Sequence, residues 1–397
     1  MLAGTRVQRR CAYDMILSLA DLVSPESVDS FIRTFADKTR WLMRTAQPDR
    51  ARALLPWPEI DRLVAGNCIP PDDFIVLLNS NVIDRRLYRD EASGALQVAA
   101  LQDLSLQGAS FGIFRISALV PQIAELTAAM ERALGVLMNA NCHVSFGKFS
   151  AFRPHFDVHD VLVLQVHGSK RWRSFGIQVA NPLRGPQIAE SGPPIWEDVL
   201  GPGDLLYLPR GEVHAAVPED RPSVHLTFGI RELTGVDFLR WLLPKAEADP
   251  ELRQGISRRA EVRRRNDTEA AIKRRLHRLI DDTPILDYLL DDDRKRPPRP
   301  LPTFDLGARL GPGIVLLSAL RRRLTLDLAT PGDLAVEIGG RQIRLSLAAR
   351  RVLDLVAARD RVAFDALAIE LQISPGDSEL RDAVLSLARH GLVGVVD

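Results

Sequence analysis

Cysteine is scarce in this sequence, and long apolar runs are missing. The 397 residues include three cysteines, Cys11, Cys68 and Cys142, which lie far apart and form no CxxC pair. An odd number of separated cysteines argues against a disulfide framework and a structural zinc site, and it fits a reducing cytoplasm. The apolar stretch near the N-terminus is interrupted by Asp14 and Asp21. Because it also lacks a small-residue cleavage site, we expect neither a signal peptide nor a membrane span.

An excess of charge of one sign is also missing. The chain has 52 Lys and Arg residues against 51 Asp and Glu residues. This balance calls for neither a nucleic-acid nor a membrane partner, and we expect neither. The basic stretch from Arg258 to Arg278 contains interspersed acids at helical spacing, which favours a solvated face or the rim of a dimer over a nucleic-acid patch.

The hydrophobic periodicity changes along the chain and predicts four parts. Residues 1–110 have mostly helical spacing and are expected to form a helical flank that leads into the first strands. Residues 111–235 have β patterning, and residues 236–296 are helical again. A charged, proline-containing linker then precedes residues 297–397, whose helices and short terminal strand are typical of a winged helix.

Alternation within the β segment predicts a barrel with a polar interior. Every second residue is polar in two separate runs, so the polar residues of each run share one face of a strand. These residues are Asn141, His143 and Ser145 in the first run and Ser223, His225 and Thr227 in the second. A polar inner row and an apolar outer row suit a barrel that holds a site inside and packs against helices outside.

Shorter patterns predict further elements around this barrel. Apolar residues recur at steps of three and four from Leu119 to Leu137, which predicts a helix packed on the sheet. Four more strands are expected at Phe74–Leu78, Phe111–Ile116, Val161–Leu164 and Leu205–Leu208. Two turns are expected at Gly168–Ser169 and Gly201–Asp204. The sequence therefore predicts an α+β protein.

Histidines gather in the β segment, which holds six of the eight in the chain. His155 and Asp157 are two residues apart, so both side chains can reach one ion from the same side of an extended segment. His214 is the natural third ligand, because it follows a predicted strand after one tight turn. Two imidazoles and one carboxylate hold Fe(II) with three coordination positions open. Taken alone, His155 would more often be a structural histidine at the surface or in the core.

Two segments carry a family resemblance. Residues 154–172, PHFDVHDVLVLQVHGSKRW, and residues 203–230, GDLLYLPRGEVHAAVPEDRPSVHLTFGI, closely resemble the JmjC-type ribosomal oxygenases, which are cupin-like protein hydroxylases. A weaker likeness extends over almost the whole chain. The resemblance implies a double-stranded β-helix, the cupin/JmjC jelly roll, within residues 111–235. It also implies a helical dimerisation segment at 236–296, hence a homodimer, and a C-terminal winged-helix-like domain.

The same resemblance implies a reaction and its ligands. It makes His155, Asp157 and His214 the iron ligands, with 2-oxoglutarate as co-substrate and dioxygen as oxidant. The substrate it implies is a side chain of a protein or peptide. A ribosomal protein is the favoured substrate, and a natural-product precursor peptide is the next candidate. Lys170 takes the position that binds the distal carboxylate of 2-oxoglutarate. The alternative for Lys170 is a solvated turn lysine beside Arg171.

Other residues match the family less completely. Asn141 and Thr227 occupy positions that hydrogen-bond the co-substrate, whereas His143 stands where animal relatives tend to have tyrosine. His225 either contacts the co-substrate or supports a neighbouring side chain. His159 and Asp160 are expected at the edge of the pocket. Trp172 and Tyr207 are expected to be core aromatics.

Two other classes of function stay open at this point. One is a metal-binding cupin scaffold without enzymatic activity, against which the intact triad and Lys170 argue. The other is a DNA-binding regulator that uses the winged helix, a shape that does not by itself imply function. Within the enzyme class, no aromatic run is evident near His155 and His214, which argues against a cage for a methylated ammonium group.

Overall fold

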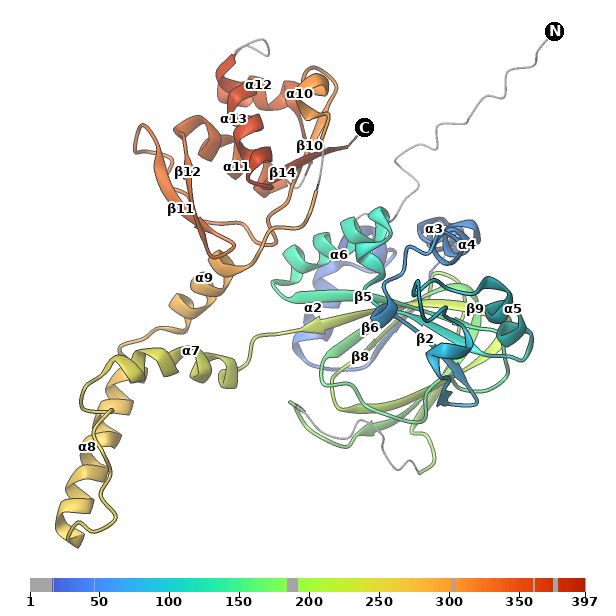
Figure 1. The fold of residues 1–397 in the computed structure, drawn as a ribbon, viewed down its shortest axis with the longest axis horizontal. Coiled ribbons are helices and arrows are strands. Elements are labelled where there is room, and N and C mark those ends of the chain that lie inside the picture. The colour runs from blue at the N-terminus through green and yellow to red at the C-terminus, as the bar shows by residue number, and fades with distance from the viewer. Residues whose placement is uncertain are drawn as a thin grey trace. The chain divides into compact units, whose positions relative to one another are not determined.

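The protein is described from a computed structural model. The structure describes residue 16 and residues 18–45, 47–183, 192–301, 304–359, 361–373 and 378–396, so Cys11 and Asp14 lie outside the described residues. The chain divides into two compact units, residues 1–232 and 233–397 (Figure 1). This division lies close to the boundary expected at residue 235, and the finer division into four parts stays a prediction.

The first unit combines helices with a large antiparallel sheet. Its helices are α1 (Leu19–Val23), α2 (Val28–Ala36), α3 (Pro48–Leu54), α4 (Trp57–Ala65), α5 (Val98–Leu106) and α6 (Pro121–Leu134). Its strands are β1 (Trp41–Met43), β2 (Phe74–Leu78), β3 (Asn81–Val82), β4 (Ser110–Ile113), β5 (Leu137–Ser145), β6 (Asp160–Ile177), β7 (Trp196–Leu200), β8 (Leu205–Leu208) and β9 (Glu212–Arg231).

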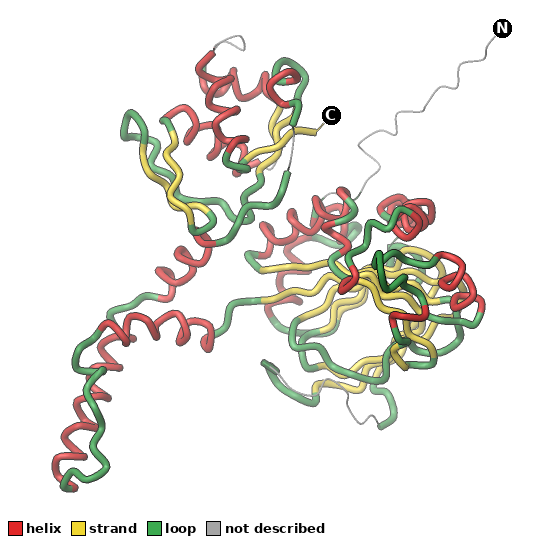
Figure 2. The backbone as a smooth tube through the Cα atoms, viewed as in Figure 1, coloured by secondary structure: helices red, strands yellow, loops and turns green. Residues whose placement is uncertain are grey.

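These strands form one nine-stranded sheet that curves around an interior, with helices outside it (Figure 2). The strand order is β1-β8-β6-β9-β5-β4-β2-β3, and β7 pairs with β6 beside this path. The long strand β9 pairs with both β5 and β6, so it connects the parts of the sheet that carry most of the polar residues noted in the sequence. In its register with β5, Asn141 lies opposite Thr227 and His143 lies opposite His225.

The outer face of the sheet packs on the helices as the alternation predicts. Ile123, Leu126 and Met130 of α6 belong to the same buried core as Ala140 and Cys142 of β5. The intervening residues of β5 therefore face the interior. The predicted helix is confirmed over Pro121–Leu134, although its expected first and last apolar residues, Leu119 and Leu137, lie outside it.

Three expectations about strands and turns need correction. The strand expected at Phe111–Ile116 ends at Ile113, because Arg115 has a left-handed backbone with φ 51° and a short 3-10 turn follows it. No turn interrupts β6 at Gly168–Ser169, where the strand continues through an irregular register instead. In the helical flank, the short strand β1 was not predicted, and it pairs with β8 at the edge of the sheet.

The second unit begins with three helices and ends in a small mixed domain. Its helices are α7 (Gly235–Ala248), α8 (Val262–Asp281), α9 (Ile285–Lys295), α10 (Leu306–Arg309), α11 (Leu347–Arg359), α12 (Phe364–Leu371) and α13 (Ser378–Arg389). Its strands are β10 (Val315–Ser318), β11 (Leu334–Ile338), β12 (Arg341–Leu345), β13 (Arg361–Ala363) and β14 (Val393–Val396). Strands β13, β10 and β14 form one sheet and β11 and β12 a hairpin, around a core of their own. Among the described helices, none has the length and apolar character needed to cross a membrane.

Candidate functional site

A cavity of about 320 Å³ opens in the interior of the barrel. Strand β5 contributes Asn141 and His143 to its lining, β6 contributes Lys170, and β9 contributes His225 and Thr227. The segment between β5 and β6 and the first residues of β9 complete the lining, so the cavity joins residues that are widely separated in the sequence. Its volume is at the lower end of the range for small-molecule sites.

Backbone hydrogen bonds hold two histidines of this lining opposite each other. The amide of His155 donates to the carbonyl of His214 at 3.1 Å, and the amide of His214 donates to the carbonyl of His155 at 2.8 Å. The amide of Gly211 donates to the carbonyl of Asp157 at 2.9 Å. The segment that carries His155 and Asp157 is therefore fixed against the start of β9.

The side chains of these residues converge on one point. Ligand atoms of His155, Asp157 and His214 all lie within 4.8 Å of one another. Nδ1 of His155 donates to the carbonyl of Arg153, and Nδ1 of His214 donates to the carbonyl of Glu212, each at 2.9 Å. Because a carbonyl only accepts, both Nε2 atoms carry a lone pair. Nε2 of His214 lies 3.6 Å from Oδ2 of Asp157.

Burial keeps the imidazole of His214 neutral. Loss of water around His214, reinforced by the nearby His155 ring, lowers its pKa below the ordinary value of histidine. A neutral imidazole is the form that binds a metal ion. Two imidazole lone pairs and one carboxylate are thus poised as a donor set that fits a divalent transition metal with open positions.

Residues of the N-terminal flank hold the strand ends that carry this donor set. Asp160, at the start of β6, accepts hydrogen bonds from Lys38 at 2.6 Å, from the Tyr207 hydroxyl at 3.0 Å and from the amide of Arg210 at 2.8 Å. Asp160 therefore supports the site from outside the cavity and is not a pocket-edge residue, which corrects the sequence expectation. His159 does line the cavity, as expected.

The start of β9 is held in a similar way. Arg40 Nη1 donates to the Glu212 carboxylate at 2.6 Å, and the Ser174 hydroxyl donates to the same oxygen. Glu212 is two residues before His214. The flank and β6 thus both contact the strand at the point where its metal-ligand candidate lies.

An irregularity in β6 determines which residues of that strand face the cavity. Val161 and Val163 lie before the irregularity and Trp172 lies after it, yet all three side chains belong to one apolar cluster. The odd-numbered residues therefore point inward before the irregularity, and the even-numbered residues point inward after it. The register shifts between Gln165 and Lys170, around Gly168, whose φ is 60°. A Cβ atom at residue 168 would lie 2.6 Å from the carbonyl oxygen of Pro222, so only glycine fits without a shift.

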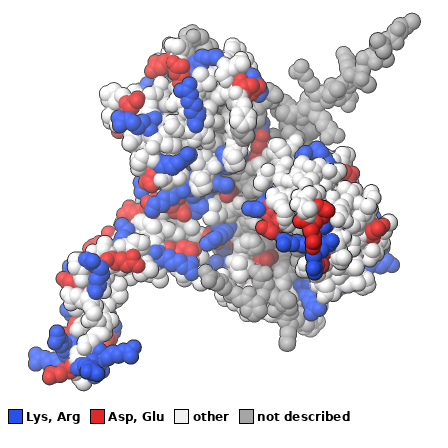
Figure 3. Space-filling model, viewed as in Figure 1, with Lys and Arg blue, Asp and Glu red and all other residues white. Residues whose placement is uncertain are grey.

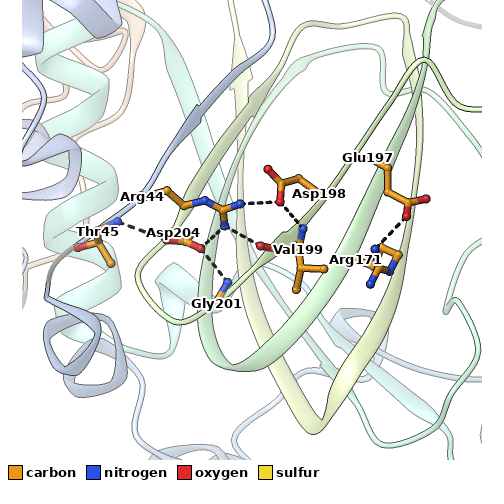
Figure 4. Close-up of polar contacts among 8 residues, drawn as sticks. All are labelled: Arg44, Thr45, Arg171, Glu197, Asp198, Val199, Gly201 and Asp204. Carbon is orange, nitrogen blue, oxygen red and sulfur yellow. Dashed lines mark hydrogen bonds and ion pairs between the residues drawn. The ribbon is translucent and has the colours of Figure 1, made fainter.

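Outside the cavity, two groups of polar contacts, around Arg44 and Arg171, join neighbouring elements (Figure 4). Arg171 contacts Glu197 of β7 at 2.9 Å, and Arg44 contacts both Asp198 and Asp204 at 2.6 Å. Asp204 also accepts from the amide of Gly201 at 2.8 Å, within the predicted turn before β8. These contacts join the flank, β6, β7 and this turn behind the wall that presents Lys170.

Lys170 is 2% exposed, so the alternative of a solvated turn lysine is wrong. Its Nζ donates to Nδ1 of His225 at 2.9 Å, and the ring of His225 stacks on His143 with centroids 5.0 Å apart. Burial lowers the pKa of Lys170 to about 7 and that of His143 to about 3, and it lowers the pKa of His225 well below its ordinary value. The cavity thus contains a buried amine that is positively charged below about pH 7, with neutral neighbours and no acid paired with it among the described residues.

The two remaining predicted residues also lie in the cavity. The Asn141 side-chain oxygen accepts from the amide of Arg115 at 3.0 Å, which orients the amide and leaves its Nδ2 group as a donor. Arg115 is itself paired with Asp73 at 2.6 Å. Thr227, opposite Asn141 on β9, lines the same wall. All seven residues predicted for iron and co-substrate therefore line one cavity.

Aromatic residues of the cavity were missed in the sequence. Phe114, Phe152 and Trp172 line it, and Phe152 contacts the rings of His143 and His155, each with centroids 5.7 Å apart. The sequence shows no aromatic run near His155 and His214, yet aromatic rings from separate segments meet beside these two histidines. Trp172 is buried as predicted for a core aromatic, but it also forms part of the cavity wall. Phenylalanines flank His155 in the sequence, and this signal could have indicated an aromatic wall.

Comparison with known proteins places this cavity in a known domain type. Residues 116–238 match the JmjC domain. A bifunctional lysine-specific demethylase and histidyl-hydroxylase NO66 of Drosophila persimilis is 28% identical over 250 residues, which are 60% of this chain and 36% of that protein. Ribosomal oxygenase 1 of Gallus gallus is 30% identical over 258 residues, which are 56% of this chain and 42% of that protein. The chain thus spans about two fifths of the length of these relatives.

Solved structures agree on the fold. YcfD, a ribosomal oxygenase from Escherichia coli in complex with cobalt and succinic acid, superposes with a TM-score of 0.55 at 16% identity, over 92% of this chain and 98% of that chain. The same protein in complex with cobalt and 2-oxoglutarate gives a TM-score of 0.54. These comparisons confirm the cupin/JmjC fold and the resemblance to JmjC-type ribosomal oxygenases that the sequence indicated.

Proposed function

We propose that this chain, which carries a JmjC domain at residues 116–238, is an Fe(II)- and 2-oxoglutarate-dependent oxygenase that hydroxylates a side chain of a protein or peptide. One observation carries the proposal. His155, Asp157 and His214 offer two imidazole nitrogens and a carboxylate within 4.8 Å of one another, in a cavity that also holds the buried Lys170. A scaffold without activity has no use for both features.

The three ligand candidates have distinct roles in this proposal. His155 and His214 would bind Fe(II) through Nε2, while their Nδ1 groups stay fixed on backbone carbonyls. Asp157 would supply the negative charge, leaving three coordination positions for the co-substrate and dioxygen. When bound, the iron supplies the oxidative decarboxylation of 2-oxoglutarate to succinate and carbon dioxide, coupled to insertion of one oxygen atom into a C–H bond.

Lys170 would bind the distal carboxylate of 2-oxoglutarate. A buried ammonium needs an anionic partner, and a charge-assisted hydrogen bond to a carboxylate provides it. Nδ1 of His225 accepts a hydrogen bond from Lys170, and this contact supports a role for His225 in orienting the lysine. Asn141, Thr227 and His143 would donate hydrogen bonds to the remaining oxygens, with His143 replacing the hydroxyl of a tyrosine by an imidazole N–H.

A protein side chain is the proposed substrate, with a ribosomal protein favoured over a precursor peptide. Asp157 is the only carboxylate among the described lining residues, so a free amino acid would find no group there to bind its ammonium. Demethylation of a methylated lysine is the second candidate reaction, because aromatic rings can bind a methylated ammonium group and the rings of Phe114, Phe152 and Trp172 line the cavity. However, Phe152 already contacts two histidines of the site, so its ring is not open to form a cage.

The second unit would serve assembly. Residues 236–296 are proposed to form a homodimer, and residues 297–397 a winged-helix-like domain. Leu239 and Leu243 of α7 are 56% and 57% exposed, whereas Leu242 is already buried within the chain. The two exposed leucines therefore support a second copy as partner. The proposed location is the cytoplasm, which the free thiols of Cys68 and Cys142 support.

Mass spectrometry tests the proposed function directly. The purified protein is incubated with Fe(II), 2-oxoglutarate and ribosomes or ribosomal proteins, and products are searched for a gain of one oxygen atom, while succinate is measured in parallel. A His155→Ala variant is the matched control. Loss of a methyl group from a lysine, without oxygen gain elsewhere, would replace the hydroxylase proposal by the demethylase one. Strong turnover driven only by free amino acids would contradict both.

A further inference from the structure

Arginine gathers at one end of α8 and in the loop before it. Between residues 253 and 265 the sequence contains six arginines and one acid, Glu261, although the whole chain has a net charge of only +1. We name these six residues the arginine tip: Arg253, Arg258, Arg259, Arg263, Arg264 and Arg265. Figure 3 shows basic side chains gathered at the lower end of α8.

The six arginines of the tip have no acidic partner among the described residues. All six side chains are exposed. None of them forms an ion pair with a described residue, whereas Lys273 pairs with Glu269 and Arg275 pairs with Asp249 at 3.0 Å further along α8. The sequence favoured a solvated face or a dimer rim for the whole basic stretch. In the structure two basic residues further along α8 have acidic partners, whereas none of the six arginines of the tip has one among the described residues.

These positive charges also lie at the end of the helix that disfavours them. The first turn of α8 contains no acid, and Arg263, Arg264 and Arg265 lie at its N-terminal end. That end of a helix carries a partial positive charge, so the arginines repel both the helix and one another. A bound polyanion would relieve this repulsion.

The surface of the arginine tip suits phosphates better than a protein interface. Three consecutive helical residues spread over about 200° of the helix circumference, so they do not form one compact pocket for a carboxylate. Apart from the isolated Ile256 and Val262, 71% and 63% exposed, the tip has no exposed large apolar residue that could form the core of a protein interface. All six cations are arginines, whose guanidinium groups bind phosphate oxygens in pairs.

We propose that the arginine tip binds the phosphate backbone of RNA. The choice of RNA over DNA rests on the proposed function, because a ribosomal protein substrate is surrounded by RNA. The charge argument itself depends only on α8 and its preceding loop. Binding would be electrostatic and would carry no sequence preference of its own.

The test is a salt titration with metal-free protein, so it does not depend on oxygenase activity. Fluorescence anisotropy measures binding to a duplex RNA, to a DNA duplex of the same sequence and to poly-glutamate. If about four phosphates are contacted, affinity for RNA should fall roughly 100-fold between 50 and 200 mM salt. The variant with Arg263, Arg264 and Arg265 all changed to alanine should bind at least about 10-fold more weakly, with a salt dependence reduced by two to three phosphate contacts.

Two further variants make the result specific. Arg258→Ala with Arg259→Ala lies before the helix, so its weaker binding cannot arise from loss of α8. Changing the exposed Arg341, Arg344 and Arg351 to alanine removes the same charge elsewhere in the same unit and should change affinity less than about twofold. Equal losses in tip and control variants would overturn the proposal. So would tighter binding of DNA than of RNA, binding of poly-glutamate as tight as that of RNA, or no binding of RNA by the unmodified protein.

Discussion

Replacing Lys170 by methionine removes the ammonium group of the cavity and keeps most of the side-chain volume. Lys170 is 2% exposed and contacts His225 at 2.9 Å, so its charge is available to a ligand inside the barrel and not to solvent. Iron is expected to depend on a different set of atoms. Lys170→Met should therefore weaken 2-oxoglutarate and leave Fe(II) binding within about twofold of the unmodified protein.

The size of the effect follows from the contact that is lost. Losing a charge-assisted hydrogen bond to a buried carboxylate, and leaving that carboxylate unpaired, costs about 2–4 kcal/mol of binding free energy. This corresponds to a rise of roughly 30- to 1000-fold in the apparent Kd for 2-oxoglutarate. Arg171→Ala is the matched control, because Arg171 pairs with Glu197 and Glu219 on the outer face of the same strand.

Protonation of Lys170 gives the same prediction a pH dependence. Burial lowers its pKa to about 7 in the ligand-free protein. Above that pH, binding of the carboxylate requires uptake of a proton, so affinity should weaken by up to about tenfold per pH unit. Without ligand, Lys170 is protonated in the unfolded chain between pH 7 and 10.5 but not in the folded chain. The contribution of Lys170 to the free energy of unfolding therefore rises with pH in that window, by up to about 5 kcal/mol.

Isothermal titration with 2-oxoglutarate and Mn(II), a redox-stable substitute for Fe(II), measures both effects without turnover. Lys170→Met should lose the affinity and its pH dependence together. An unchanged Kd for 2-oxoglutarate in this variant would refute the assignment, and weakening in Arg171→Ala instead would transfer the role to the outer face. A melt of Lys170→Met between pH 7 and 10 should lack the rise in stability.

Three further predictions concern the metal, the sheet and the assembly. His155→Ala or Asp157→Ala should leave the circular dichroism spectrum unchanged and abolish both Fe(II) binding and succinate release, since a two-ligand site holds Fe(II) poorly; succinate release at the normal rate would contradict the ligand set. Gly168→Ala should destabilise the protein by about 2–4 kcal/mol in urea unfolding, because the added Cβ meets a backbone carbonyl at positive φ; a loss below about 0.5 kcal/mol would show that the strand adapts. Light scattering at micromolar concentration should report a dimer, which Leu239→Glu with Leu243→Glu should convert to a monomer; a monomeric unmodified protein would defeat the dimer proposal.

Much of the site could be predicted because its signals are local. His155 and Asp157 are two residues apart, and strict alternation in the sequence places Asn141 beside His143 and His225 beside Thr227 on inward faces. Each of these inferences needs only the period of a strand. The structure agrees with them because β5 is regular over its whole length.

The parts that failed depend on long-range contacts or on backbone irregularity. Asp160 follows the metal pair in sequence, yet Lys38, 122 positions away in the chain, draws its carboxylate out of the cavity. Phe114 and Phe152 come from loops, whose course no periodicity fixes. The segment around Gly168 has the composition of a turn, and only pairing with both neighbouring strands keeps it extended.

The irregularity at Gly168 also makes this wall of the barrel sensitive to chain length. The irregularity changes which alternate residues of β6 face the cavity. Val161 and Lys170 therefore face the same side although they are an odd number of positions apart. At the present chain length, simple alternation through this segment would turn Arg171 and Arg173 inward and Lys170 and Trp172 outward. A substitution alters one side chain, whereas loss of the irregularity would invert the whole second half of the strand. The strand can lose the irregularity and keep Lys170 inward only if one residue is lost with it, so the number of residues between Gln165 and Lys170 and the backbone shape there are constrained together.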